Sequence, residues 1–155
     1  MAKSPSEDPF EAALAALDRK ERTAHELALW LKRRGFDLDE IEPALRRLFE
    51  AGALDDERFA RRFADDKRDL SGWGAERIRE ALLARGVESA TVDAVVASES
   101  YGDQVERARE ILIRRGRPLD GNADRQRALD YLTRRGYEYE IAYEAVRQAA
   151  TPRAA

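Results

Sequence analysis

The sequence predicts an all-α protein made of three tandem three-helix repeats, each a helix-turn-helix-like unit. A short phrase that ends in arginine, glycine and an apolar residue occurs three times, as LKRRGF, LLARGV and LTRRGY. Its glycines, Gly35, Gly86 and Gly136, are 51 and 50 residues apart, a spacing typical of helical repeat proteins. Apolar residues around the three copies recur at helical spacing, and no segment alternates as a strand does.

The repeat extends beyond the six-residue phrase. Aligning residues 26–45, 77–96 and 127–146 places apolar residues of the three copies in shared columns. These columns are Leu27, Ile78 and Ala128; Leu31, Leu82 and Leu132; Ala44, Val95 and Ala145; and Leu45, Val96 and Val146. Helix breakers then divide the chain into a disordered tail at 1–8, repeats at 9–54, 55–100 and 101–150, and a C-terminal tail at 151–155.

Capping signals mark the helix starts. In the first repeat a helix runs from Phe10 to about Glu21, and the pairs Thr23 with Glu26 and Asp37 with Glu40 fit capping boxes for the next two helices. The third of these helices stops at Gly52. In the second repeat the helices start at Asp55, after the SGWG turn at 71–74, and at Ser89, which is expected to act as a cap. In the third repeat the first helix runs from Tyr101 to Arg115, and the segment GRPLDGN at 116–122 breaks it. The second helix follows this segment and continues to Gly136, and the last helix ends near Ala150.

Each anchor glycine is expected to end the second helix of its repeat. A helix that turns sharply commonly needs a left-handed residue past its last turn, where glycine has no side-chain penalty. The preceding arginines suit the negative end of the helix dipole. The trailing residues Phe36, Val87 and Tyr137 are expected to pack against the turn.

Composition excludes several classes of site. The chain has no cysteine, so it has no disulfide, no thiolate zinc site and no cysteine nucleophile. The single histidine, His25, lies in a predicted helix without a second metal-ligating partner, and no GxxxxGK phosphate loop occurs. Because these motifs are missing, no cofactor is expected. No signal peptide or membrane-spanning run is apparent, so a cytoplasmic protein is expected.

Acidic pairs do not read as catalytic dyads. Asp55 with Asp56 and Asp65 with Asp66 are interpreted as helix-start charges on a solvated face, because no flanking apolar pocket indicates a raised pKa. Trp30 and Tyr131 share one repeat column and are expected to pack between helices. Phe59 and Phe63 lie one turn apart on one face of a helix, and both are expected to be buried. Trp73, in the SGWG turn, either fills the seam between repeats or is presented to a partner.

Positive charge is concentrated near the C-terminus. Of the 28 basic residues, 24 are arginines. A GC-rich genome would account for their number but not for their position. Residues 107–135 hold nine arginines against four acidic residues, a net charge of +5 in a chain of net charge −3. Arginine forks suit carboxylates, phosphates and protein interfaces.

The phrases LDDERFARRFADDK at 54–67 and GWGAERIREALLARGV at 72–87, with the EL…L…RG phrase of the first repeat, carry a resemblance to a known family. From about Leu14 to Ala149 the chain resembles the RecX family of bacterial recombination regulators, which act in DNA repair and the SOS response. The matching motif residues are Asp55, Asp56, Phe59, Phe63, Gly72, Trp73, Gly74 and Arg77.

The resemblance implies an elongated, curved array that binds the RecA recombinase, lies in the groove of its DNA-bound filament, and suppresses filament growth, ATP hydrolysis and strand exchange. It implies no catalysis and no membrane, and we expect a monomer. Three small repeats must stack to bury a core, which agrees with an extended concave surface.

An alternative function is sequence-independent DNA binding through an arginine patch that contacts phosphates. In either case the expected partner-binding or DNA-binding residues are Arg107, Arg109, Arg114, Arg115, Arg117, Arg125, Arg127, Arg134 and Arg135. Catalysis ranks third among the possible functions, because no constellation of catalytic residues is apparent.

Overall fold

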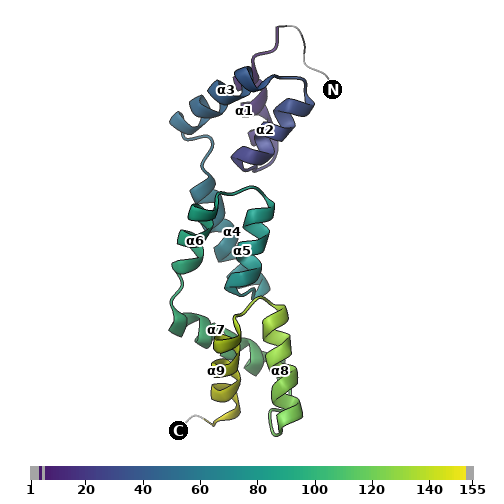
Figure 1. Ribbon diagram of the computed structural model, residues 1–155, viewed down its shortest axis with the longest axis vertical. Helices are drawn as coiled ribbons and strands as arrows, with labels where there is room; N and C mark the ends of the chain where they lie inside the picture. The colour runs from purple at the N-terminus through teal and green to yellow at the C-terminus, as the bar shows by residue number, and fades with distance from the viewer. Residues whose placement is uncertain (1–3, 5, 153–155) are drawn as a thin grey trace. The chain divides into compact units, whose positions relative to one another are not determined.

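The computed structural model describes Ser4 and residues 6–152. Within these residues the chain forms nine α-helices and no strand, as predicted (Figure 1). The helices are α1 (Pro9–Arg19), α2 (Ala24–Arg33), α3 (Leu38–Glu50), α4 (Asp56–Ser71), α5 (Ala75–Ala84), α6 (Ser89–Ala97), α7 (Tyr101–Arg115), α8 (Asn122–Arg134) and α9 (Tyr139–Ala150).

Contacts divide the chain into two compact units. The N-terminal unit comprises Met1–Arg61 and Leu82–Val92, and the C-terminal unit comprises Arg62–Ala81 and Asp93–Ala155. The boundaries therefore fall inside α4, α5 and α6, so the second predicted repeat contributes residues to both units.

In the N-terminal unit, α1, α2 and α3 pack on one another around a core that is rich in leucine and alanine (Figure 1). Leu27, Leu31 and Leu48 are fully buried there. The two predicted capping boxes of this unit are confirmed, with Glu26 accepting from the Thr23 N–H at 3.0 Å and Glu40 accepting from the Asp37 N–H at 2.9 Å. These bonds fix where α2 and α3 begin.

Part of the predicted N-terminal tail is held by the N-terminal unit. Asp8 caps α1 by accepting from the Phe10 N–H at 3.0 Å. Glu7 accepts two hydrogen bonds from Arg34, at 2.7 and 3.0 Å. These bonds lower the pKa of Glu7 below its ordinary value. The rest of the predicted tail, at 1–3 and 5, lies outside the described residues, as do residues 153–155 of the predicted C-terminal tail.

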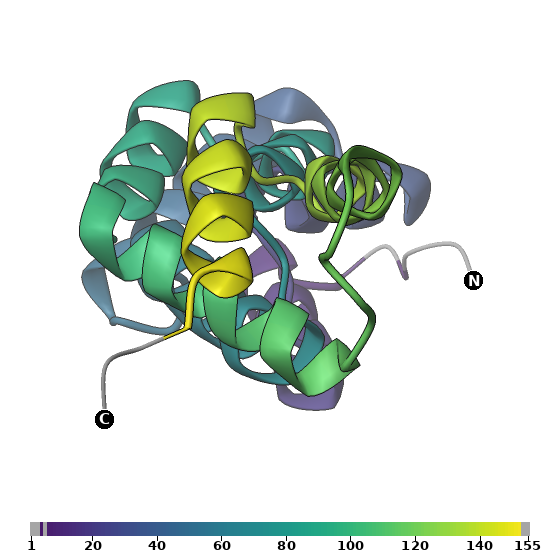
Figure 2. The same cartoon turned by 90° about the horizontal axis from the view of Figure 1, so that it is seen from below.

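In the C-terminal unit, α9 packs along α7 and α8 (Figures 1 and 2). Leu112, Leu132 and Ile141 are among the buried residues of this second core. Gly116, at φ +67°, ends α7 in a left-handed conformation. The green connection that follows it leads to α8 (Figure 2) and corresponds to the break predicted at 116–122.

Ser89 was expected to act as a helix cap, and this prediction is wrong. Ser89 is the first residue of α6, and the carbonyl of Glu88 already accepts from the Val92 N–H at 3.0 Å. The helix thus begins one residue earlier than the serine signal indicated. Shifts of this size are common at helix starts, because the N–H groups of the first turn have no intrahelical acceptors.

The predicted glycine stops are confirmed. Gly35, Gly86 and Gly136 follow α2, α5 and α8 at φ values of +102°, +82° and +97°. The apolar residues that come next, Phe36, Val87 and Tyr137, are 3%, 3% and 2% exposed. Each of their N–H groups bonds to the leucine carbonyl five residues earlier, which closes the helix end.

Two of these helix ends receive the start of another helix. In the C-terminal unit, the Gly74 N–H donates to the Arg135 carbonyl at 2.8 Å and the Glu76 N–H donates to the Gly136 carbonyl at 2.9 Å. In the N-terminal unit, Thr23 Oγ1 donates to the Arg85 carbonyl at 2.7 Å. The positive start of one helix thus meets the negative end of another, a favourable arrangement of helix dipoles.

Candidate anion-binding site

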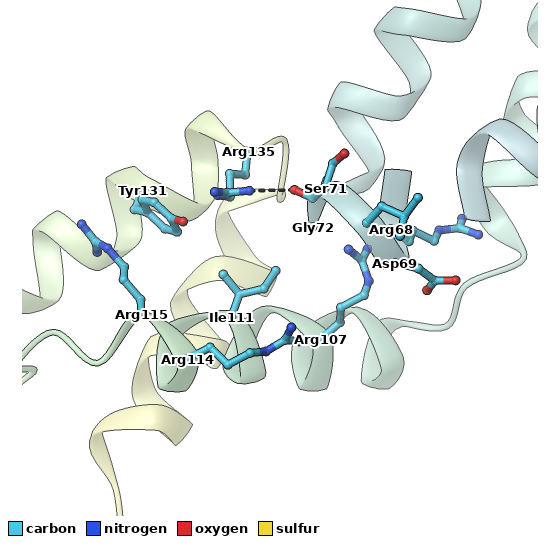
Figure 3. A pocket seen from close by; sticks show the side chains of 11 residues that line it. Arg68, Asp69, Ser71, Gly72, Arg107, Ile111, Arg114, Arg115, Tyr131 and Arg135 are labelled. Carbon is cyan, nitrogen blue, oxygen red and sulfur yellow. Dashed lines mark hydrogen bonds between the residues drawn. The ribbon is translucent and has the colours of Figure 1, made fainter. Parts of the chain in front are cut away.

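A cavity of about 300 Å³ lies in the C-terminal unit between the end of α4, one face of α7 and the end of α8 (Figure 3). Five of its lining residues are arginines and one is a carboxylate. The lining consists of Arg68, Asp69, Leu70, Ser71, Gly72, Arg107, Ile111, Arg114, Arg115, Tyr131 and Arg135.

Helical spacing brings these side chains together. Arg107, Ile111 and Arg114, with the adjacent Arg115, follow one another along α7 at intervals that place them on one face. Tyr131 lies on α8, and Arg135 follows four residues later at the helix end. A tight turn at Gly72, at φ +65°, ends α4, and a Cβ there would lie 3.1 Å from Ile111 Cδ1.

Arg107 is a structural residue of the cavity wall. Its guanidinium donates to both oxygens of Glu99, at 2.7 and 2.9 Å, and to the Trp73 carbonyl and the Tyr137 hydroxyl, each at 2.6 Å. Burial by itself would lower the pKa of Arg107, but the hydrogen bonds to Glu99 raise it above its ordinary value. The side chain, 14% exposed, is a charged hub that joins the 71–74 turn to α7.

Tyr137 completes this network. Its hydroxyl donates to the Gly72 carbonyl at 3.2 Å while it accepts from Arg107. Burial raises the pKa of Tyr137 to about 12, although the positive charge of Arg107 acts against this shift. The phenol is therefore neutral at physiological pH, and it can act as donor and acceptor at once.

Arg68 is nine-tenths buried and ion-paired at the side of the cavity. Its Nε lies 3.5 Å from Glu99 Oε1 and makes no hydrogen bond among the described residues. Its Nη2 donates to the Val95 carbonyl at 3.3 Å. Sequence analysis missed Arg68, because residues 58–106 have a net charge of −2 and charge counting gave no signal there.

Two further guanidinium groups lie over the Tyr131 ring. Arg115 is 4.1 Å and Arg135 4.7 Å from the ring centroid, distances at which cations are attracted to an aromatic face. Arg135 also donates to the Ser71 carbonyl at 2.7 Å (Figure 3). Neither forms an ion pair within the described part of the chain, so both keep their charge available to an anion.

Arg114 lies at the open edge of the cavity. Its side chain is 74% exposed, and its ion pair with Glu110 has an N–O distance of 3.9 Å. An exposed pair of this kind holds an arginine weakly. The cavity therefore combines hydrogen-bonded arginines in its wall with an exposed, weakly paired one at its edge, and this chemistry suits the binding of an anion.

A second, smaller cavity of about 150 Å³ in the same unit shares Arg115 with the first. Arg117 and Arg127 also line it, together with Asp124. Asp124 accepts from Arg127 at 2.6 Å, so part of the positive charge is already balanced. The connection between α7 and α8 supplies Pro118 and Leu119 to its wall.

Three of the nine arginines predicted to bind a partner line neither cavity. Arg109 is buried and donates to Glu106 at 3.2 Å. Arg125 donates to the Leu119 carbonyl at 3.2 Å, and Arg134 is exposed on α8. The structure thus gathers Arg107, Arg114, Arg115 and Arg135 at one cavity and Arg117 and Arg127 at the next.

The motif residues of α4 differ in burial. Phe59 is 5% exposed, as predicted, and Arg85 lies 4.4 Å above its ring centroid. Phe63 was also predicted to be buried, but it is only half-buried. Its ring meets that of Trp73 edge-on, with the centroids 6.2 Å apart. Phe63 is less buried than predicted because it packs on Trp73, which is itself half-buried.

Trp73 packs within the C-terminal unit. Besides Phe63, its ring contacts Lys67 and Arg77, which lie 4.6 and 4.2 Å from the ring centroid. Of the neighbouring motif glycines, Gly74 is buried and bonds to Arg135. Of the two predicted roles for Trp73, packing is observed.

One expectation for the acidic pairs is wrong. Asp55 is exposed and accepts from the Arg58 N–H at 3.0 Å, as a helix-start residue does. Asp56 is half-buried and accepts from the Ala24 N–H at 2.9 Å, at the start of α2. Burial raises the pKa of Asp56 above its ordinary value, and this outweighs the hydrogen bond from Ala24. Its role is to cap a helix that lies far away in the sequence.

Two kinds of site are absent from the described part of the chain. No group of three or more histidine or acidic side chains there could hold a metal ion. No helix in residues 6–152 is long and apolar enough to cross a membrane.

Comparison with known proteins assigns each third of the chain to one family. Family models described as the first, second and third three-helix domains of RecX match residues 10–48, 55–96 and 102–146. A regulatory protein RecX of Halorhodospira halophila is 39% identical over 138 residues, which are 85% of this chain and 82% of that protein. The corresponding protein of Trichlorobacter lovleyi is 32% identical over 86% of this chain and 90% of its own length. The match to the Halalkalibacterium halodurans protein, also 32% identical, covers 52% of that longer chain.

A solved structure supports the fold. The crystal structure of RecX from Lactobacillus salivarius matches with a TM-score of 0.81 over 91% of this chain and 94% of that one, at 20% identity. Three consecutive domain matches and relatives above 30% identity over most of both chains establish the family. The chain belongs to the RecX family, and its three tandem three-helix domains are those of that family.

Proposed function

We propose that the chain is a non-catalytic regulator of homologous recombination in the bacterial cytoplasm, which binds the RecA recombinase and its DNA filament. In this role it limits filament extension, ATP hydrolysis and strand exchange. The observation that carries the proposal is membership of a family whose matched members are named regulatory proteins.

The arrangement of the C-terminal unit supports a role in binding. Its most distinctive feature is a cavity lined by five arginines. A cavity of this kind can meet the acidic groups of a protein filament or the phosphates of the DNA that the filament holds. A protein that regulates its partner simply by binding to it needs a binding surface of this type, but it needs no catalytic group.

The test is ATP turnover by RecA filaments assembled on single-stranded DNA, measured with increasing amounts of the purified chain. Inhibition is expected, together with co-sedimentation of the chain with the filament. The control is the chain alone, which should hydrolyse no ATP. Unchanged turnover combined with failure to co-sediment would reject the proposal, and ATP turnover by the isolated chain that persists through further purification would reject its non-catalytic part.

A further inference from the structure

We propose that the turn after α2 is a docking site for the start of α8 from a second copy of this chain, so that copies associate head to tail. This turn, called the Gly35 turn, consists of residues 34–37 and belongs to the N-terminal unit, whereas α8 belongs to the C-terminal unit. The inference goes beyond the proposed function, because it concerns how two copies of the chain bind to each other.

The first observation is that the chain contains one kind of helix junction twice. After α5, the Arg85 carbonyl accepts from Thr23 Oγ1 at 2.7 Å, at the start of α2. After α8, the Arg135 carbonyl accepts from the Gly74 N–H at 2.8 Å, at the start of α5. In both junctions the acceptor is the arginine before the anchor glycine, and the donor is the residue immediately before a helix.

The second observation is that the Gly35 turn is a third copy of this acceptor. Gly35 has a φ of +102°, and the Phe36 N–H bonds to the Leu31 carbonyl at 3.1 Å, as in the other two copies. Among the described residues, however, none donates to the Arg34 carbonyl. A cavity of about 480 Å³ lies at this turn. Its lining consists of Lys32, Gly35, Phe36, Asp37, Leu38 and Asp39.

This cavity corresponds to the place that a helix start occupies in the second copy. Gly35 and Asp37 are the counterparts of Gly86 and Glu88, each 51 residues later. Gly86 and Glu88 line a cavity together with His25, which comes from the start of α2. A Cβ on Gly86 would overlap the His25 ring, so the helix start lies directly against the glycine there. The cavity at Gly35 therefore has the position of a docked helix start.

The third observation is that the start of α8 is exposed. This helix is the repeat counterpart of α2 and α5, whose starts are both docked within the chain. Gly121, Asn122 and Ala123 are exposed, and a Cβ on Gly121 would meet no atom within 4 Å. Gly121 is the N-cap residue and has no side chain to bond the first N–H groups of the helix. The start of α8 thus offers the donors that the Gly35 turn can accept.

The two surfaces are complementary in charge, because the start of a helix is partly positive and the end of a helix is partly negative. At the start of α5, the donors are the N–H groups of the residue before the helix and of its second residue. The corresponding donors of α8 are the N–H groups of Gly121 and Ala123. We expect them to bond to the carbonyls of Arg34 and Gly35 in the next copy. Such a contact joins unlike surfaces, so it can continue from copy to copy.

The experiment is thiol cross-linking between two variants of the chain, which has no cysteine of its own. Leu38→Cys marks the cavity and Ala123→Cys marks the start of α8, and both positions are exposed. The variants are mixed in equal amounts and treated with a short bismaleimide. The control pair is Leu38→Cys with Ala90→Cys, because Ala90 is also an exposed second residue of its helix. Circular dichroism confirms that each variant is folded.

The first pair should give about tenfold more cross-linked heterodimer than the control pair, because docking raises the local concentration of the two thiols. In sedimentation velocity, the sedimentation coefficient of the unchanged chain should rise with concentration, and the monomer expected from the sequence should remain the main form in dilute solution. Ala123→Trp places a large ring in the contact and should weaken this association about tenfold or more. Ala90→Trp should stay within about twofold of the unchanged chain.

Three results would overturn the proposal. Equal heterodimer yields from the two pairs would mean that the cross-links form by random collision. A sedimentation coefficient that does not change with concentration would show that the chain does not associate, and would leave the Gly35 turn to a helix of another protein. Equal weakening by Ala123→Trp and Ala90→Trp would place the contact away from the start of α8. None of these measurements involves RecA, so this proposal and the proposed function fail separately.

Discussion

Gly136 packs directly against Arg77. A Cβ built on Gly136 would overlap the Cβ of Arg77 and would lie 2.5 Å from its backbone nitrogen. Gly86 is in the same relation to His25 in the N-terminal unit, where an added Cβ would overlap the imidazole ring and the His25 Cβ. The recurring arginine-glycine phrase thus has two roles. It ends a helix in a left-handed conformation, and in two of its three copies it also makes room for the start of another helix.

Replacing Gly136 with alanine should destabilise the protein more than replacing Gly116. Both glycines have positive φ, +97° and +67°, so both variants incur roughly 1 to 2 kcal/mol for a left-handed alanine. A Cβ at Gly116 meets nothing within 4 Å, whereas one at Gly136 meets the α5 backbone. We expect an additional loss of roughly 1 to 3 kcal/mol from overpacking, measured as the free energy of unfolding in urea. Equal losses in the two variants would show that φ alone requires the glycine.

Phe59→Ala should cost roughly 3 to 5 kcal/mol in the free energy of unfolding, because a buried ring is replaced by a cavity. Phe59 is 5% exposed, and the guanidinium of Arg85 covers it. The control is Phe49→Ala in the same unit, where the side chain is 48% exposed and a cost below about 1 kcal/mol is expected. A similar small cost at both positions would contradict the assignment of Phe59 to the core.

Arg107→Ala should lower stability by roughly 3 to 5 kcal/mol, because it leaves Glu99, which is 12% exposed, without its bidentate partner. Arg114→Ala, seven residues later on the same helix, removes a side chain that is 74% exposed and should change stability by less than about 0.5 kcal/mol. The measurement is the melting temperature of each variant, compared with that of the unchanged chain. If Arg107→Ala melts like the unchanged chain, Arg107 is not a structural hub.

Tyr137 predicts a fall in stability at alkaline pH. Its pKa is raised from an ordinary value of 10.0 to about 12, so its contribution is fully present below about pH 10 and is lost as the pH rises through about 12. By linkage, the difference amounts to roughly 2 to 3 kcal/mol. Tyr137→Phe should be less stable than the unchanged chain at pH 8, because it loses two hydrogen bonds. Urea unfolding across the alkaline range should show this gap narrowing, and a constant gap would contradict the buried phenol.

Reversal of charge at the first cavity should weaken inhibition of RecA, if the proposed function holds. Arg114→Glu with Arg115→Glu is expected to raise the concentration needed for half-inhibition in dilute salt by about tenfold or more, and less so in high salt. The matched double reversal is Arg33→Glu with Arg46→Glu, both exposed residues of the N-terminal unit. An equal rise in the half-inhibitory concentration for both double reversals would show that the first cavity does not bind the filament.

The sequence alone determined the helices, their order and most of their ends. Local signals are sufficient for these features: the Thr23 and Glu26 capping box, the left-handed glycines and the apolar spacing act within a few residues of one another. The same locality explains why Phe36, Val87 and Tyr137 were correctly predicted to pack, since each closes the helix that precedes it. The family also follows from the sequence, because the α4 and α5 phrases are specific to it. That the array is elongated and curved stays a prediction.

Only the tertiary structure decided which arginines are available. In the sequence, Arg107 and Arg114 are equal members of a basic segment, yet one is bonded on several sides by Glu99, Trp73 and Tyr137 and the other lies at the mouth of a cavity. Charge counting cannot separate them, because the partners of Arg107 come from elsewhere in the chain. For the same reason it missed Arg68 and the raised pKa of Asp56. Burial and ion pairing depend on contacts between distant segments, and these contacts exist only once the helices have packed.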